Sequence, residues 1–205
     1  MLAMSIRAER SAGYFGKIPA RGDFVASGLA SPIVSAWDMI VSSAVAAGKA
    51  AMAERWSEVW LQAPVWRFAL PPNLCGPAPL LGLWMPSIDK VGRYFPLMLA
   101  TTWPGATPER MARRGTVWLD AAEDAGRAAI AEDLAPGQLT ALIPSVSGLD
   151  AEPDSGLPYS LRPRRGAGLW WTEGAALVPA QGLVLDAMPD AATFIAMLDA
   201  GSAAS

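Results

Sequence analysis

The chain has 205 residues, of which 52% are hydrophobic and 17% charged, a balance that suits a large packed core and excludes a disordered protein. The net charge of -3 and the pI of about 5.0 exclude a basic surface that attracts nucleic acid over long range. Histidine is absent, which removes the Ser-His-Asp triad, Cys-His catalysis and most zinc sites, and the single cysteine rules out an intrachain disulfide and fits a reducing compartment.

The first residues indicate a chain that stays inside the cell. We expect residues 1–12 to form a flexible leader and residues 13–205 to form one domain, because the start carries no apolar run long enough for a signal peptide. The most apolar long stretch, residues 29–52, has Asp38 near its middle. A charge at that depth is costly in a bilayer, so the stretch predicts a buried helix and a cytoplasmic protein without membrane insertion.

The N-terminal third predicts one strand and two helices. Residues 13–18 form a short strand that Pro19 ends, and a turn follows at Arg21-Gly22-Asp23. Ser31, followed by proline, is typical of a helix cap. The remaining predicted elements of this part are a helix at 31–48 and a second helical piece at 49–60.

Three strands are predicted in the middle of the chain. Alternation in residues 65–70 places Trp66, Phe68 and Leu70 on one apolar face, which we expect to be buried against helices. Residues 80–85 and 97–102 are nearly all apolar, as in central strands covered on both faces. The short connection between them favours antiparallel pairing.

The C-terminal half alternates helices with weaker strands. Thr107 caps a long helix, residues 144–166 form a mobile loop, and Asp190 caps a closing helix. The predicted helices and strands here are, in order, 107–134, 136–142, 169–172, 183–185 and 190–198. The whole pattern predicts an α/β (α+β) protein, with a mostly antiparallel mixed sheet of about five to seven strands and helices packed on its faces.

The residues that could carry catalysis or bind a cofactor do not combine into a site. Cys75 has no imidazole partner and is expected to be a small buried hydrophobe. A phosphate-binding loop fails at Gly13–Lys17, because the hydroxyl residue that should follow the lysine is Ile18. Adjacent carboxylates such as Glu123 and Asp124 do not face one another on a helix, which indicates a solvated face. We therefore expect no catalysis, no cofactor and no metal.

One connection between two apolar strands is rich in polar and aromatic side chains. Residues 86–97 include Asp89, Lys90, Arg93 and Tyr94. They could form a rigid loop in which Asp89 bonds to local backbone and Arg93 to a carboxylate. They could instead present a binding patch, since Arg and Tyr are enriched at binding hot spots.

Several long motifs in this chain resemble the TagF family of bacterial type VI secretion-associated proteins. They are, in the family's order, Gly13–Phe24, Trp37-Asp38, Pro64–Phe68, Cys75-Gly76, Pro86–Leu97 and Trp170–Thr172, with Lys90 standing where the family commonly has Arg. The resemblance implies a repressor of type VI secretion that acts after translation and binds a forkhead-associated scaffold protein, Fha. With it we expect a partner-binding surface that comprises Arg21, Asp23, Asp89, Lys90, Arg93 and Tyr94.

Two other functions stay open. One is an enzyme or a binder of a small phosphorylated ligand that uses Lys17, Arg21, Asp89 and Arg93. The absence of histidine counts against catalysis of this kind. The other is a structural accessory subunit of the secretion apparatus, against which the lack of heptads counts weakly.

Overall fold

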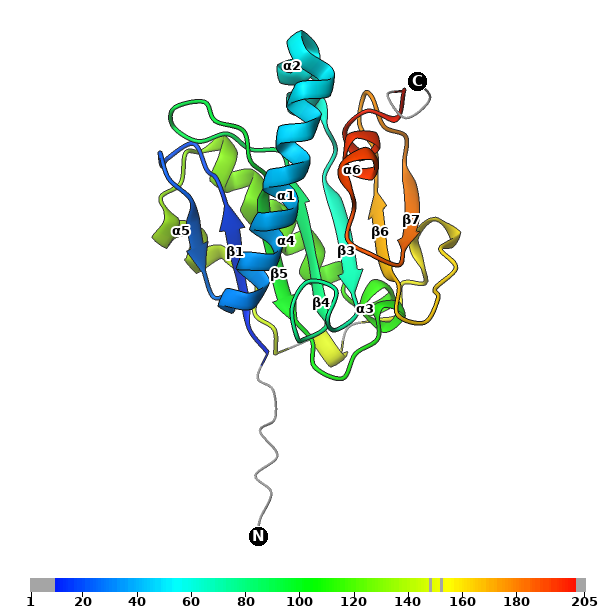
Figure 1. The fold of residues 1–205 in the computed structure, drawn as a ribbon. Helices are drawn as coiled ribbons and strands as arrows, with labels where there is room; N and C mark the ends of the chain where they lie inside the picture. Colours follow the sequence, from blue (N-terminus) through cyan, green and yellow to red (C-terminus); the bar gives the residue numbers. More distant parts are fainter. Residues whose placement is uncertain (1–9, 148, 152, 202–205) are drawn as a thin grey trace.

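The structure, a computed structural model, describes residues 10–147, 149–151 and 153–201. A seven-stranded sheet in the order β2-β1-β5-β4-β3-β6-β7 runs through the middle of this part (Figure 1), and all six neighbouring pairs are antiparallel. The strands are Ala12–Gly16 (β1), Val25–Ser27 (β2), Trp66–Leu70 (β3), Leu80–Met85 (β4), Leu97–Thr102 (β5), Gly168–Thr172 (β6) and Gln181–Leu185 (β7). The predicted class and the antiparallel pairing of β4 with β5 are confirmed.

Helices cover both faces of the sheet. Helices α1, α2 and α6 share one hydrophobic core with the sheet, and α3, α4 and α5 share the other; Figure 1 shows α1 in front of the sheet and α4 behind it. The α-helices of the described residues are Ser31–Met52 (α1), Trp56–Gln62 (α2), Pro108–Arg114 (α3), Thr116–Ala131 (α4), Pro136–Leu142 (α5) and Ala191–Leu198 (α6). Short 3-10 turns occupy Ala53–Arg55, Leu149–Ala151 and Pro158–Ser160.

The side chains of β3 are buried on the two faces of the sheet as the alternating sequence pattern predicts. Trp66, Phe68 and Leu70 are fully buried in the core beneath α1 and α6, and Ala69 contributes to the opposite core. Every residue of β4 and β5 is buried, as expected for central strands with helices on both faces. The sheet therefore separates two apolar layers.

Several helix boundaries differ from expectation. Ala30, not Ser31, is the N-cap of α1, and no side chain caps it. The predicted helix 107–134 is two helices, because Gly115 separates α3 from α4. A Cβ at Gly115 would lie 2.3 Å from a methyl carbon of Leu81, so the close approach of this corner to β4 requires glycine. Two of the three predicted acidic or hydroxyl caps are found: Thr107 accepts from the Arg110 N–H, and Asp190 from the Thr193 N–H.

The ends of other elements also shift. Helix α1 continues to Met52, beyond the predicted end at Gly48, and the strand expected at 13–18 is β1, which begins at Ala12 and ends at Gly16. Strand β2 was not predicted. Residues 1–9 of the expected leader lie outside the described residues.

The segment from 144 to 166, apart from residues 148 and 152, contacts α3 and then β7: the Ser155 N–H donates to the Arg113 carbonyl, and Arg164 donates to the Val184 carbonyl. Leu149 and Leu161 are buried in the core beneath α3 and α4. The Asp150 carboxylate accepts hydrogen bonds from Arg110 and from the indole N–H of Trp103. These contacts fix parts of the segment, and its expected mobility stays a prediction. No described helix is long and apolar enough to cross a membrane.

Candidate partner-binding site

Two connections meet at one end of the sheet, at the upper left of Figure 1. The first, residues 17–24, joins β1 to β2, and the second, residues 86–96, joins β4 to β5. They lie together because β1 and β4 both pair with β5. The backbone N–H of Lys90 donates to the carbonyl of Arg21 across 2.9 Å, which ties the two connections to each other.

Asp89 is the centre of this arrangement. Its side chain is fully buried, and one oxygen accepts from the Lys17 ammonium at 2.9 Å and from Nε of Arg93 at 2.7 Å. The other oxygen accepts from the backbone N–H groups of Val91 at 3.0 Å and Arg93 at 2.9 Å. The loop therefore closes around a carboxylate whose acceptors are all used.

The surroundings of Asp89 favour its ionised form. Burial by itself favours the neutral acid, but the hydrogen bonds from the Arg93 N–H, the Lys17 ammonium and the Arg93 guanidinium outweigh it and hold the pKa of Asp89 well below its ordinary value. Gly92 has a φ of 84°, which allows the tight turn over the carboxylate. Asp89, with the donors Lys17, Val91 and Arg93 bonded to its carboxylate, thus forms a rigid frame for the connection.

An aromatic cluster supports the neighbouring connection. Phe24 stacks on Phe15 with ring centroids 5.3 Å apart and meets the edge of Phe95 at 4.8 Å. The buried Lys17 ammonium lies 5.2 Å from the centroid of the Phe24 ring. Although its inner side packs in this way, Phe24 is 46% exposed, and Val91 at the tip of the other connection is 68% exposed. Neither residue was among the predicted site residues.

The structure divides the predicted site residues between a frame and a surface. Arg21, Asp23 and Lys90 are exposed, whereas Asp89 is buried and cannot touch a partner itself. Arg93 has both properties, because 57% of its side chain is exposed while its guanidinium holds Asp89 and donates to the carbonyl of Gly22.

Tyr94 faces a different neighbour. It is half-buried, its ring meets the edges of Trp56 and Trp60, and its hydroxyl donates to the Ser57 hydroxyl at 2.9 Å. The indole N–H of Trp60 donates in turn to the carbonyl of Ser87. Tyr94 therefore attaches the connection to α2, apart from the exposed cations.

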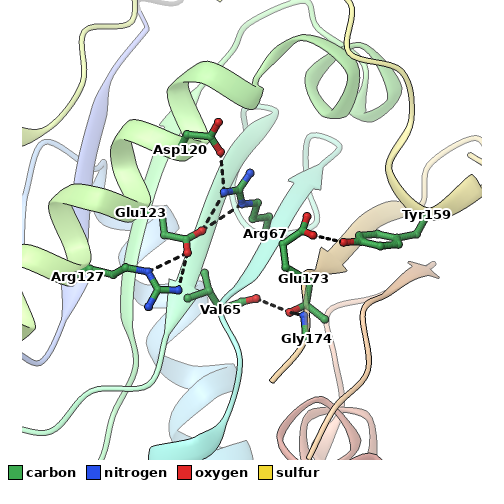
Figure 2. A network of polar contacts seen from close by, with 9 residues as sticks. Val65, Arg67, Asp120, Glu123, Arg127, Tyr159, Glu173 and Gly174 are labelled. Atoms are coloured by element: carbon green, nitrogen blue, oxygen red, sulfur yellow. Dashed lines mark hydrogen bonds and ion pairs between the residues drawn. The ribbon is translucent and has the colours of Figure 1, made fainter. Parts of the chain in front are cut away.

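A second polar network lies on the opposite face, between β3 and α4 (Figure 2). Arg67 bonds to Asp120 at 2.7 Å and to Glu123 at 2.9 Å, and Arg127 bonds to the other oxygen of Glu123 at 2.6 Å. The side chains of Arg67 and Glu123 are 14% and 17% exposed, so the expectation of a solvated Glu123 is wrong. Two cations balance two carboxylates here, and the network works as a clamp between helix and strand.

The single thiol of the described part is buried. Cys75 is 1% exposed, and burial raises the pKa of its thiol to about 12, so the buried small hydrophobe that the sequence predicts is confirmed. Among the described residues, no three His, Cys, Asp or Glu side chains gather as metal ligands would.

Comparison with known proteins connects this geometry to a family. Residues 13–146 match the TagF N-terminal domain, a type VI secretion system-associated family. The chain belongs to this family. The TagF match includes both connections of the candidate site and ends before β6, β7 and α6.

The likeness to a solved structure extends over most of the TagF-family chain. PA0076 from Pseudomonas aeruginosa PAO1 shares 28% sequence identity with it, over 93% of this chain and 94% of that one, with a TM-score of 0.69. No curated protein matches the chain. The likeness therefore reaches beyond the matched domain, over most of the chain.

Proposed function

We propose that this TagF-family protein is a non-catalytic cytoplasmic regulator that represses type VI secretion after translation by binding an apparatus component such as the scaffold Fha. The family association with type VI secretion supports the process. The observation that carries the binding role is the pair of connections, in which a buried Asp89 frame presents exposed Phe24 and Val91 beside exposed cations.

Rigid presentation favours protein binding for a physical reason. A loop that is already ordered loses little conformational entropy when a partner docks, so more of the contact energy contributes to affinity. Aromatic and arginine side chains are the usual anchors of such contacts. Phe24 and Arg93 are both partly exposed and held by neighbours, which suits that role.

The same geometry is less suited to the phosphorylated-ligand alternative. Lys17 is 6% exposed and its ammonium is bonded to Asp89, so this pair is occupied with the frame. Arg21 and Arg93 alone then face solvent among the four residues of that hypothesis. The role of accessory subunit has no observation that favours it over regulation.

Titration calorimetry with the purified Fha scaffold tests the proposal. We expect Val91→Asp to weaken binding about tenfold or more, because a charge would enter the apolar part of the surface. Met39→Asp is the matched control, since Met39 is 70% exposed on α1. In cells that lack the protein, type VI secretion should rise, and the Val91→Asp variant should fail to restore repression while Met39→Asp restores it. Absence of any Fha binding by the wild-type protein would contradict the proposal.

A further inference from the structure

The charges at the candidate site do not cancel. Lys17 is paired with Asp89, and Arg93 lies between Asp89 and the carboxylate of Asp23, which is 3.9 Å from its guanidinium. These two cations and two anions balance. The charge that remains at the site comes from the two other exposed cations.

Those cations are Arg21 and Lys90. Both residues are exposed, and the described residues offer no hydrogen-bond or ion-pair partner to either side chain. The backbone bond from Lys90 N–H to the Arg21 carbonyl holds them on neighbouring backbone. A chain with a net charge of -3 thus carries two unpaired cationic side chains on neighbouring backbone at this site.

A groove of about 440 Å³ begins at Arg21, the backbone neighbour of Lys90. It is lined by Arg21, Gly22, Asp23, Phe24, Val25, Ala26 and Pro136. The groove thus lies between the start of β2, which is an edge strand of the sheet, and Pro136 at the start of α5. Edge strands carry outward backbone N–H and C=O groups that can pair with a further strand.

We infer that the surface binds an acidic polypeptide segment that lies extended along the outer edge of β2. This inference rests on the proposed function and specifies the part of the partner that is recognised. Carboxylates of the segment pair with Arg21 and Lys90, its backbone pairs with β2, and an apolar side chain packs on the exposed face of Phe24. Asp23 repels a carboxylate placed beside Arg93, so the acidic side chains align with Arg21 and Lys90.

The first experiment reverses the unpaired charges. Binding of the Fha scaffold is measured for wild type, for Arg21→Glu with Lys90→Glu, and for Arg162→Glu with Arg165→Glu as the control. Arg162 and Arg165 are also exposed, and they lie in the segment that meets β7, at the opposite edge of the sheet. The two double variants change the net charge equally, so a difference between them reports position.

We expect the first double variant to bind at least about tenfold more weakly and the control to bind like wild type. Wild-type affinity should also fall as NaCl rises from about 50 to about 500 mM, and the first variant should lose most of that dependence. Equal affinity of all three proteins would overturn the acidic-segment inference and leave the proposed function standing.

The second experiment decides the inference even when the scaffold does not bind. A peptide of about ten residues that alternates Glu with Ser is titrated into isotopically labelled protein, followed by backbone amide NMR. The same peptide with Lys for Glu, and inorganic phosphate, are the controls. We expect shifts at residues 21–26 and 89–93 with the acidic peptide alone. Shifts elsewhere, no shifts, or equal shifts with phosphate or the Lys peptide would contradict an extended acidic segment.

Discussion

The indole N–H of Trp66 on β3 donates to the carbonyl of Met197 on α6 across 2.8 Å. The Trp66 side chain is fully buried between the sheet and the helices of the α1 face. One side chain therefore fills a large part of a core and also satisfies a carbonyl near the C-terminal end of the last helix.

Loss of this side chain should destabilise the protein strongly. We expect Trp66→Ala to lower the free energy of unfolding by roughly 3–5 kcal/mol, because apolar contacts are lost and a cavity remains. Trp66→Phe keeps most of the apolar volume and should cost less, although the Met197 carbonyl loses its donor. Urea unfolding followed by circular dichroism measures both. Near-wild-type stability of the alanine variant would show that β3 is not packed as described.

The two cations that hold Asp89 should differ in their contribution to stability. Lys17 is buried, so Lys17→Met removes a cation from a buried pair and should cost about 3–5 kcal/mol. Arg93 is 57% exposed, and water can replace it while Asp89 keeps Lys17 and two backbone donors, so Arg93→Ala should cost about 1 kcal/mol. Chemical denaturation of the two variants side by side tests this order. A larger loss for Arg93→Ala would make it the principal tether.

Protonation of Asp89 at acidic pH should lower the stability of the protein. The pKa of Asp89 is lowered in the folded protein, so its contribution to stability is complete above the unfolded pKa of about 4 and is lost as the pH falls below it. Wild-type protein should therefore lose more stability between about pH 6 and about pH 3 than Asp89→Asn, which has no carboxyl to protonate there. Urea midpoints at the two pH values measure the difference. Equal losses in both proteins would exclude Asp89 as a source of acid sensitivity.

The buried Cys75 thiol should lower the stability of the protein at alkaline pH. Burial raises the pKa of Cys75 to about 12, so folding favours the neutral thiol, and this preference costs stability once the pH passes the unfolded pKa of about 8.5. We expect wild type to lose more stability than Cys75→Ala between about pH 8 and about pH 10. A thiol reagent at about pH 8 should label Cys75 only in the unfolded protein. Rapid labelling of the native protein would show that the thiol is accessible.

Local patterns predicted the parts of the fold that depend on one segment alone. Strands β3, β4 and β5 were predicted closely because alternation and continuous apolar runs report burial directly. Thr107 and Asp190 were predicted as caps because a cap bonds to the backbone only three residues away.

Features that depend on a distant segment were missed. At the break between α3 and α4, Gly115 lies close to Leu81, and Glu123 pairs with Arg67; both neighbours lie in other elements. The candidate site divides in the same way. The motif residues of both connections could be named, but the sequence does not tell that Asp89 is inside the frame while Phe24 is partly outside it.

The pairing of β3 has a consequence for synthesis on the ribosome. One edge of β3 pairs with β4, which follows soon after, but the other pairs with β6, where Arg67 meets Trp171 near the end of the chain. In a growing chain that ends with the matched domain, the edge of β3 that will pair with β6 is still open. Trp66 on this strand also lacks its acceptor, the Met197 carbonyl, which has not yet been made. Open strand edges of this kind promote association between unfinished chains. Until β6 and α6 have been made, this edge of β3 and the Trp66 indole therefore lack the partners that they have in the folded protein.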